Sequence, residues 1–490
     1  FLPTQAPPSG HRPPVRPAAT TLQLLMHYLP QLLFVILLAA MGYLIFRRVS
    51  RIRGNILMGR PEDRSDRPAE RWRAMALFSL GQKKMFKKPL VAVMHFLLYA
   101  AFIIINLEVL EIILDGIFGT HRLFFPYLGA AYGPIINFFE LLALGVIIVC
   151  VVFLVRRNVK GVGPKRLHAD FHREMRGWPS LDGNLILVFE ILLMMAFLTM
   201  NASDVALQNR GWGHYAEAQT GGFLISRFLV PLFEGWESTA ALVAYERAAW
   251  WIHITGILAF ALYVTYSKHL HIGLAFPNTY YQRLVPKGEM KNMDRVTQEV
   301  KLMLGLPVET PQNGNGAESN GAAAEAEIPR FGAKDVPDLT WKQIMEAYTC
   351  TECGRCTDAC PANLTGKKLS PRKIMQDVRD RAEEIGELRA KGETDDGKSL
   401  LGDYTTKEEL MACTTCNACV EACPVQINPL DIILEQRRYV AMEEAQTPAS
   451  WNAMFQNVEN NFAPWAFPAS DRFAWADALK EEPKNRDAAS

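Results

Sequence analysis

Residues 350–361 read Cys-Thr-Glu-Cys-Gly-Arg-Cys-Thr-Asp-Ala-Cys-Pro, and residues 413–424 read Cys-Thr-Thr-Cys-Asn-Ala-Cys-Val-Glu-Ala-Cys-Pro. Both stretches have the spacing C-x2-C-x2-C-x3-C-P. Three thiolates at this spacing wrap one iron–sulfur cubane, and in a chain with two such runs the fourth cysteine binds the other cluster. A structural zinc site also uses four sulfurs, but it does not need this spacing twice with a trailing proline. The sequence therefore predicts two [4Fe–4S] clusters.

The crossed pattern gives each cluster a set of four ligands. Cluster one is expected to use Cys350, Cys353, Cys356 and Cys423. Cluster two is expected to use Cys413, Cys416, Cys419 and Cys360. The ninth cysteine, Cys150, lies in an apolar run and is expected to face lipid or a core. Such clustering indicates metal ligation in a reducing compartment and not a disulfide framework.

The residues around the two runs predict helices. Capping boxes are expected at Thr340-x-x-Gln343 and Thr406-x-x-Glu409, ahead of the two cysteine runs. An N-cap followed by a proline occurs at Ser370-Pro371 and at Asn428-Pro429. Between the runs, apolar residues recur at helical spacing: Ile374, Val378, Ile385 and Leu388. We expect an α-helical ferredoxin domain over 334–445, whose lysines and arginines solvate a helix face, with no nucleic-acid partner.

The 490 residues leave room for two or three domains. From residue 301 onward the chain has 21 Lys+Arg against 31 Asp+Glu, a net charge of −10; the first 300 residues have 31 against 20, a net of +11. A basic, apolar first half and an acidic, polar second half indicate two different kinds of domain. The overall net charge near zero therefore describes neither half.

Five stretches of the first half are long and apolar enough to cross a bilayer, which takes about 20 residues. They cover approximately 22–46, 90–114, 130–155, 183–203 and 241–267. The fold class predicted for the chain is therefore all-α. A five-helix transmembrane bundle, in a membrane domain 22–275, precedes the ferredoxin domain.

The charges of the loops predict the orientation in a prokaryotic cytoplasmic membrane. The loops after the first and third spans are basic, with Arg47, Arg48, Arg51, Arg53, Lys83, Lys84, Lys87 and Lys88 in one and Arg156, Arg157, Lys160, Lys165 and Arg166 in the other. Between spans two and three there is only Arg122. The N-terminal segment 1–21 is therefore expected outside, and everything after the fifth span in the cytoplasm.

Histidines in the spans indicate haem. Bis-imidazole ligation of a b-type haem needs one histidine from each of two facing helices at the same depth. His95 lies in the second span, roughly 9 Å below the inner surface. This depth fits His271, or alternatively His269, at the end of the fifth span. We expect one haem b here, at the cytoplasmic side.

A second haem is an alternative that the sequence leaves open. His253 lies in the outer half of the fifth span and His27 at a comparable depth on the first, whereas the second span has Ile105 where another ligand would be expected. His253 and His27 are therefore candidates for a second haem or for a quinone site, with a buried polar contact as the other interpretation.

Carboxylates within spans are costly and often functional. Glu190 lies about seven residues into the fourth span from the cytoplasm, and Glu108 and Glu140 lie toward the outside. Because quinone reduction consumes protons, Glu190 is a candidate for a proton path. The other interpretation is an interfacial or helix-paired carboxylate.

The remaining segments are expected to be a connector between the two domains and a C-terminal tail. Residues 276–333 are expected to be a cytoplasmic connector that contains a flexible linker, 308–328, without periodicity or apolar residues to bury. The tail 446–490 is expected to be irregular. Its aromatic residues suggest a docking segment, with a poorly ordered tail as the other interpretation: Trp451, Phe455, Phe462, Trp465, Phe467, Phe473 and Trp475.

Both halves resemble known families. Five spans with histidines on the second and fifth resemble the gamma subunit of respiratory nitrate reductase. Phe331, Asp338-Leu-Thr-Trp-Lys342, the run 350–361 and Ser267-Lys-His-Leu-His271 look like the heterodisulfide-reductase-related membrane iron–sulfur oxidoreductases. The resemblance implies electron exchange between a cytoplasmic redox partner and the quinone pool. Members of that family often continue into Cys-Cys-Gly domains, but no cysteine follows Cys423, so the soluble substrate's site is expected on another subunit.

Three functions remain open on the sequence alone. In the first, a Cys-Cys-Gly iron–sulfur protein or electron-transfer flavoprotein supplies electrons to the clusters, which pass them through haem to menaquinone in a respiratory complex. The second reverses the current, so that quinol reduces a heterodisulfide or thiol-type substrate on a partner. In the third, the chain is a non-catalytic membrane anchor whose clusters sense redox state. The first two make the chain a subunit of a quinone-linked oxidoreductase.

Overall fold

The computed structural model describes residues 21–162, 173–307 and 330–481. It confirms the all-α fold class, because these residues form helices and, in place of strands, only the isolated bridges Arg60–Thr340 and Leu401–Thr405. The described residues divide into two compact units. A membrane unit comprises residues up to Ile52 together with Gln82–Ile272, and a ferredoxin unit comprises Arg53–Gly81 together with the residues from Gly273 onward. The linker predicted at 308–328 lies outside the described residues.

The membrane unit contains all five predicted spans. Its long helices are α1 (Thr21–Ile56), α3 (Pro89–Phe118), α5 (Tyr132–Asn158), α6 (Trp178–Asn209) and α8 (Thr239–Val264), and each is long and apolar enough to cross a membrane. The loops of this unit contain the short helices α4 (Phe125–Leu128) and α7 (Val230–Glu234). The number and positions of the spans were therefore predicted correctly, and the chain is a multi-pass membrane protein.

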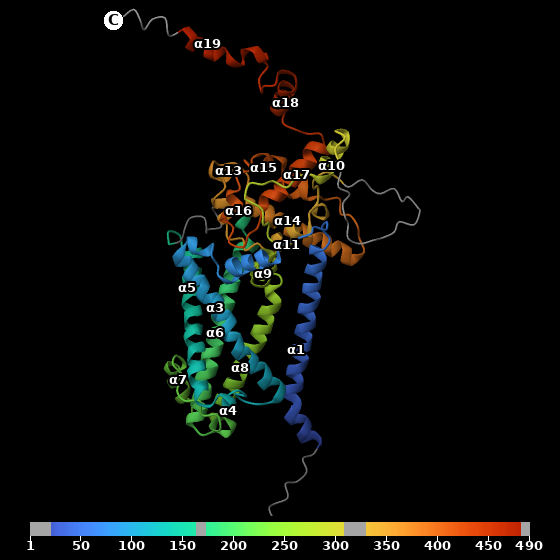
Figure 1. Ribbon diagram of the computed structural model, residues 1–490. Coiled ribbons are helices and arrows are strands. Elements are labelled where there is room, and N and C mark those ends of the chain that lie inside the picture. Colours follow the sequence, from blue (N-terminus) through green and yellow to red (C-terminus); the bar gives the residue numbers. More distant parts are fainter. Residues whose placement is uncertain (1–20, 163–172, 308–329, 482–490) are drawn as a thin grey trace, which may run out of the picture. The chain divides into compact units, whose positions relative to one another are not determined.

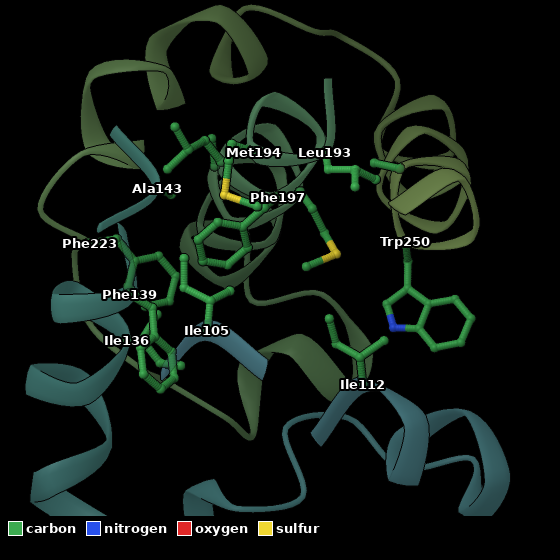
Figure 2. Close-up of a cluster of buried hydrophobic side chains, with 14 of the residues drawn as sticks. Ile105, Ile112, Ile136, Phe139, Ala143, Leu193, Met194, Phe197, Phe223 and Trp250 are labelled. Atoms are coloured by element: carbon green, nitrogen blue, oxygen red, sulfur yellow. The ribbon is translucent and has the colours of Figure 1, made fainter. Parts of the chain in front are cut away.

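Four of the five spans form a bundle with an apolar core. Helix α6 packs against α5 and α8, and α3 packs against the same two helices (Figure 1). Figure 2 shows the core between them, which includes Ile105 of α3, Phe139 of α5, Phe197 of α6 and Trp250 of α8. Cys150 is buried in this core, in agreement with the expectation for the ninth cysteine.

Helix α1 touches the bundle sparingly. Phe34 is fully buried against the rings of Trp250 and Trp251, at centroid distances of 5.4 and 5.9 Å. Gly116 of α3 permits this approach, because a Cβ there would lie 2.4 Å from the Phe34 ring. Most other apolar side chains of α1 are exposed within the unit, among them Leu32, Leu33, Ile36, Tyr43 and Phe46. Such a surface suits contact with lipid.

The ferredoxin unit is built from shorter helices around the cysteine runs. They are α2 (Pro68–Met75), α9 (His271–Tyr280), which begins at the unit's edge, α10 (Asp294–Met303), α11 (Trp341–Thr349), α12 (Arg355–Asp358), α13 (Pro361–Leu364), α14 (Pro371–Lys391), α15 (Lys407–Met411), α16 (Ala418–Ala422) and α17 (Pro429–Met442). Both capping boxes and both N-cap side-chain bonds form as predicted, at Thr340, Thr406, Ser370 and Asn428.

The segment 53–81 joins the ferredoxin unit although the sequence placed it in the membrane domain. The backbone of Arg60 forms two hydrogen bonds with this unit. Its N–H donates to the carbonyl of Leu339 at 2.7 Å, and its carbonyl accepts from the N–H of Trp341 at 3.1 Å. The indole of Trp341 also donates to the carbonyl of Glu62 at 2.9 Å. Asn55, in the last turn of α1, donates to the hydroxyl of Tyr348 at 2.9 Å. The end of α1 is thus part of the ferredoxin fold.

The aromatic tail is helical and not irregular. Helices α18 (Ala449–Asn461) and α19 (Ala474–Glu481) form where the sequence predicted no regular structure. In α18, Trp451, Phe455 and Val458 recur at helical spacing and lie on one face. Their side chains are exposed within the described residues. The predicted role in docking stays a prediction.

Replacing Gly386 by alanine should destabilise the ferredoxin unit. A Cβ at Gly386 in α14 would lie 2.2 Å from Oδ1 of Asn55, and the side chain of Asn55 is held in place because its Nδ2 donates to the hydroxyl of Tyr348. Overpacking of this kind costs typically 1–3 kcal/mol, so the thermal unfolding midpoint of the purified chain should fall. Gly54→Ala is the matched control, because nothing lies within 4 Å of that Cβ and the helix gains propensity. Equal midpoints for both variants would contradict this packing.

Candidate functional site

The two cysteine runs fold in the same way. In each run a capped helix ends just before the first cysteine: α11 ends at Thr349 before Cys350, and α15 ends at Met411 shortly before Cys413. The third cysteine lies in a short helix, Cys356 in α12 and Cys419 in α16. The fold thus presents the thiols from helix ends and tight turns.

Left-handed residues occur at equivalent places in both runs. The second residue after the first cysteine has a positive φ, 54° at Glu352 and 56° at Thr415, and so does the fourth, 77° at Gly354 and 60° at Asn417. For residues other than glycine this conformation costs roughly 1–2 kcal/mol. Strain of this kind persists only where the surrounding structure imposes it, and it occurs preferentially at binding sites. The repeated pattern turns the chain around a common centre.

Cys360 lies with the second run and not with its own. It lines a pocket of about 310 Å³ of empty volume together with Cys413, Cys416 and Cys419. The remaining wall is formed by apolar and small residues, including Pro361, Leu369, Leu430 and Ile433. The N–H of Thr415 donates to Sγ of Cys413 at 3.4 Å. The four cysteines expected for cluster two are therefore brought together.

Cys423 lies, conversely, with the first run. Its thiol is an electrostatic neighbour of Cys350 and Cys353, and the Cys356 thiol is a neighbour of all three. Burial, followed by the charge of Glu352 and the Cys353 thiol, raises the pKa of Cys350 to about 11, and burial followed by the Cys353 thiol raises that of Cys423 to about 12. The N–H of Ile427 donates to Sγ of Cys423 at 3.3 Å. Buried thiolates need positive charge close by, which the iron of a cluster supplies when bound.

Both sets suit a group larger than a single ion. In the described ranges, no group of three or more histidine, cysteine, aspartate or glutamate side chains is arranged to hold one metal ion. The thiolates of a cubane bind different iron atoms of one cluster and need not converge on a point. The N–H···S bonds and the all-cysteine donor sets fit a [4Fe–4S] cluster in each position, and the second set also lines a pocket.

The surroundings of the two sets differ in charge. Near the first set, the guanidinium of Arg379 is an electrostatic neighbour of Cys350, and Nη1 pairs with Oε1 of Glu352 at 2.8 Å. Near the second set, Arg437 donates through Nη2 to the carbonyls of Leu410 and Cys413, each at 2.6 Å. Within the described part of the chain Arg437 pairs with no carboxylate. The second set thus has an additional, uncompensated positive charge.

The histidine pair of the membrane unit is formed by His95 and His271. Their ring centroids are 6.5 Å apart with an interplanar angle of 36°. Nδ1 of His95 is 3.0 Å from Oε1 of Gln82, and Nδ1 of His271 is 3.0 Å from the carbonyl of Lys268. The ring of His269 lies beside that of Phe260, with centroids 5.7 Å apart and an interplanar angle of 47°, and it meets His271 edge-on. Of the two alternatives for the partner of His95, His271 makes a ring contact with it, and His269 is an electrostatic neighbour of both His95 and His271.

The other membrane candidates are not joined to this pair by the contacts of the described residues. His253 is buried in α8 beside Phe197, with ring centroids 6.1 Å apart, and its Nδ1 has no hydrogen-bond partner. Ile105 is buried in the core, as Figure 2 shows. Glu190 lies in α6 near the Cys150 thiol. The side chain of His27 lies outside the described residues.

A buried polar network at the other end of the bundle was not predicted from the sequence. Arg122 donates to Oδ2 of Asp204, through Nε at 2.9 Å and Nη2 at 2.7 Å, and to Oδ1 of Asn201 at 2.9 Å. Burial alone would lower the pKa of Arg122, but Tyr132 and Asp204 raise it well above its ordinary value. In the sequence, Arg122 stands out only as a loop charge. The signal for the network was the number of carboxylates in the neighbouring spans.

Comparison with protein families supports the ferredoxin unit. The family described as a 4Fe-4S dicluster domain matches residues 349–427. A second family, described as the conserved transmembrane helix of mechanosensitive ion channels, matches residues 16–64. That match covers one helix and supports only a membrane-type helix there. No solved structure matches the chain.

Curated relatives cover nearly the whole chain. FadF of Bacillus subtilis, named as a probable iron–sulfur-binding oxidoreductase, is 28% identical over 91% of this chain and 60% of its own length. The EtfAB:quinone oxidoreductase of Syntrophomonas wolfei is 26% identical over 91% of this chain and 59% of its own length. A polypeptide of the dihydromethanophenazine:CoB–CoM heterodisulfide reductase of Methanosarcina acetivorans is 31% identical over 29% of this chain and 35% of its own length.

These relatives are iron–sulfur oxidoreductases, and the chain has the dicluster domain and membrane helices that agree with a redox role in a complex. The chain spans about 60% of the length of the first two. The heterodisulfide-reductase resemblance is thus supported at the level of iron–sulfur oxidoreductases, and the haem domain stays a prediction.

Paired cysteine substitutions should reveal the crossed ligand sets. If Cys360 binds the same cluster as Cys416, the double variant Cys360→Ala/Cys416→Ala should disrupt one cluster and leave four irons per chain in the other. Cys360→Ala/Cys353→Ala should disrupt both clusters. Iron analysis and electron paramagnetic resonance of the reduced chain measure the difference. The reverse result, with one cluster surviving in the second variant, would assign each run to its own cluster.

Arg437 should raise the reduction potential of the cluster held by the second set. Removing its charge with Arg437→Gln should lower that midpoint by tens of millivolts, because net charge near a cluster sets its potential. The control, Arg379→Gln/Glu352→Gln, removes a neutral pair beside the first set and should shift the other midpoint less. A redox titration followed by paramagnetic resonance measures both values. An unchanged midpoint in Arg437→Gln would refute the role of this charge.

Proposed function

We propose that the chain is the membrane electron-transfer subunit of a respiratory complex, relaying electrons between a cytoplasmic redox partner and menaquinone or a similar quinone. The observation that carries the proposal is the combination, in one chain, of two four-cysteine sets with a histidine pair in the membrane unit. When bound, two [4Fe–4S] clusters and a b-type haem would supply one-electron carriers at these positions.

The spacing of the histidine pair supports a haem. The imidazoles of His95 and His271 would hold the iron of a b-type haem between them, and the haem would supply a one-electron carrier there. The centroids of His95 and His271 are 6.5 Å apart. A hydrogen-bonded packing pair would not need this separation.

The partners of the Nδ1 atoms support the same assignment. Histidines that bind a metal usually donate the other ring N–H to a carbonyl or carboxylate, which fixes the tautomer and the ring orientation. The carbonyl of Lys268 and Oε1 of Gln82 can accept such bonds from His271 and His95. Nε2 would then be the ligating atom on both rings.

The cysteine sets would bind the two clusters in the crossed arrangement. Cys350, Cys353, Cys356 and Cys423 would hold cluster one, and Cys413, Cys416, Cys419 and Cys360 cluster two. The thiols of both sets would be bound to iron, which would leave none of them as a nucleophile for substrate chemistry. The residues of the ferredoxin unit therefore position carriers and exclude water, and the soluble substrate would be converted by a partner.

The orientation and the partner are part of the proposal. The basic loops favour an external N-terminus and a cytoplasmic ferredoxin unit. The name of the Syntrophomonas relative points to electron-transfer flavoprotein as the electron donor. A Cys-Cys-Gly iron–sulfur protein is the other candidate partner. Because the chain spans about 60% of that relative, the whole complex's activity belongs to this proposal.

A second candidate reverses the current. The relative from Methanosarcina acts, by its name, on a heterodisulfide, and its match supports a quinol-oxidising chain that delivers electrons to a thiol-type reductase. The two candidates differ in potentials and partners and share every residue role described above. A non-catalytic anchor with redox-sensing clusters, in contrast, predicts no haem.

A reduced-minus-oxidised visible spectrum of the purified complex tests the haem. We expect a b-type α-band that disappears in His95→Ala and His271→Ala, because each removes an axial ligand. His269→Ala is the matched control and should keep the band, since its ring lies against Phe260. If the band survives in His271→Ala and is lost in His269→Ala, the ligand is His269. A wild-type complex without the band would sink the haem assignment and favour the anchor.

A further inference from the structure

The membrane unit contains a polar cavity far from the histidine pair. It lies between α3, α6, α8 and the segment that follows α3. Glu108, in its wall, follows His95 by 13 residues on α3, which places it about 20 Å further along the helix axis. The wall consists of Glu108, Glu111, Ile112, Asp115, His121, Arg122, Met200, Asp204, Glu246 and Trp250.

Most carboxylates of the wall are held by donors of the protein. Glu111 accepts from the hydroxyl of Tyr132 and from the N–H of Phe124, both at 2.8 Å. Asp115 accepts from the hydroxyl of Thr120 at 2.5 Å and from the N–H groups that follow it. These acids fasten the chain after α3 onto the bundle and have a structural role.

The remaining two paired acids are held in the same way. Asp204 accepts two bonds from Arg122 and one from Gln208, and lies 3.5 Å from Nε2 of His121. Glu246 accepts from the hydroxyl of Tyr215 at 2.5 Å and from Arg247. Their charges are therefore matched by neighbouring cations and donors.

Glu108 is the exception. Its side chain is buried, with 4% of the residue exposed, and it faces the cavity. Among the described residues no donor hydrogen-bonds to it and no cation forms an ion pair with it; Arg122, Glu111 and Glu140 act on it only over longer distances. A carboxyl group left unpartnered at this depth in a membrane protein is costly, and such residues mark functional sites.

The cavity favours a neutral ligand with a polar edge and an apolar body. The apolar side chains of Ile112, Met200 and Trp250 line it beside the carboxyl of Glu108. The cation Arg122 is already paired, so an anionic ligand would meet the carboxylates of the wall without a counter-charge. A metal ion would need several convergent ligands, and the described part of the chain offers no such group.

A second unsatisfied group lies on the same helix face. Glu246, Trp250 and His253 follow one another at helical spacing on α8. Nδ1 of His253 is buried without a hydrogen-bond partner, while the ring is hydrogen-bonded to the backbone of Leu193. Nδ1 of His253 lies about one helical turn from Trp250 of the cavity wall and adds a polar atom that a ligand could contact.

We propose that this cavity binds the head group of a quinone, with Glu108 as the residue that hydrogen-bonds its oxygen. A protonated Glu108 donates to a quinone carbonyl, and an ionised Glu108 accepts from a quinol hydroxyl. A titratable carboxyl serves both forms of this ligand. The proposal rests on the quinone-linked function above and adds to it the place where the quinone binds.

Binding of a short-tailed naphthoquinone to the full chain in lipid nanodiscs tests this site. Calorimetry should give saturable binding to the wild type and an affinity at least tenfold weaker for Glu108→Leu, because a hydrogen bond to a charged or buried group is lost. Glu108→Gln keeps a donor and an acceptor and should bind within about threefold of the wild type. Asn106→Leu, at an exposed position of α3 two residues earlier, is the matched control and should bind like the wild type.

The outcomes separate this site from the function on which it rests. Wild-type affinity in Glu108→Leu would overturn the site while leaving a quinone-binding chain. Absence of saturable binding in the wild type would overturn both the site and the quinone half of the function. Iron content and the reduced-minus-oxidised spectrum, which should be unchanged in Glu108→Leu, report on folding and on the carriers independently.

Discussion

The exchange of fourth cysteines between the two runs is the constraint on which the ferredoxin unit depends. Cys360 lies with Cys413, Cys416 and Cys419, and Cys423 lies beside the first run. Neither four-cysteine set can form unless both runs, separated by more than fifty residues, fold together. The helices reflect this: α12 packs against α16, and α14 packs against α11 and α17. A unit held this way has no half that is complete by itself.

The membrane unit is governed by a different constraint, the cost of polar groups away from water. Its middle is an apolar core, as Figure 2 shows. Polar groups concentrate at its ends, and there they are paired. Glu140 illustrates this, since it accepts from Asn201 and from the N–H groups of Ile225 and Ser226. Against this background, groups without partners, such as Glu108 and Nδ1 of His253, become informative.

The features predictable from sequence were those set by local periodicity or by fixed spacing. The five spans follow from the length of apolar runs, and the capping boxes at Thr340 and Thr406 follow from residues three apart. The depth match of His95 with His271 or His269 required only the rise of a helix, and the structure brings the rings of His95 and His271 close together. The helical spacing of Trp451, Phe455 and Val458 also indicated α18, but the tail was interpreted from its aromatic content and predicted to be irregular.

The features that escaped prediction depend on contacts between distant residues. The pairing of Arg60 with Leu339 and Trp341 assigns the segment 53–81 to the ferredoxin unit, and nothing local in that segment indicates it. The same holds for Arg122 and Asp204, which are 82 positions apart. The left-handed Glu352 and Thr415 escaped for another reason, because glutamate and threonine do not favour that conformation and only the surrounding fold imposes it.

The division of the chain into two units has a physical reason under the proposed function. An iron–sulfur cluster is charged and is stabilised by backbone N–H groups and cations, which the ferredoxin unit supplies through Thr415, Ile427 and Arg437. A quinone is neutral and dissolves in the bilayer, so its site must lie among the spans and needs only a few polar contacts. Its reduction adds protons as well as electrons, and a buried carboxyl such as Glu108 can exchange a proton where a cluster cannot. The charged clusters and the apolar quinone therefore require different surroundings, and one chain supplies both by joining a polar unit to an apolar one.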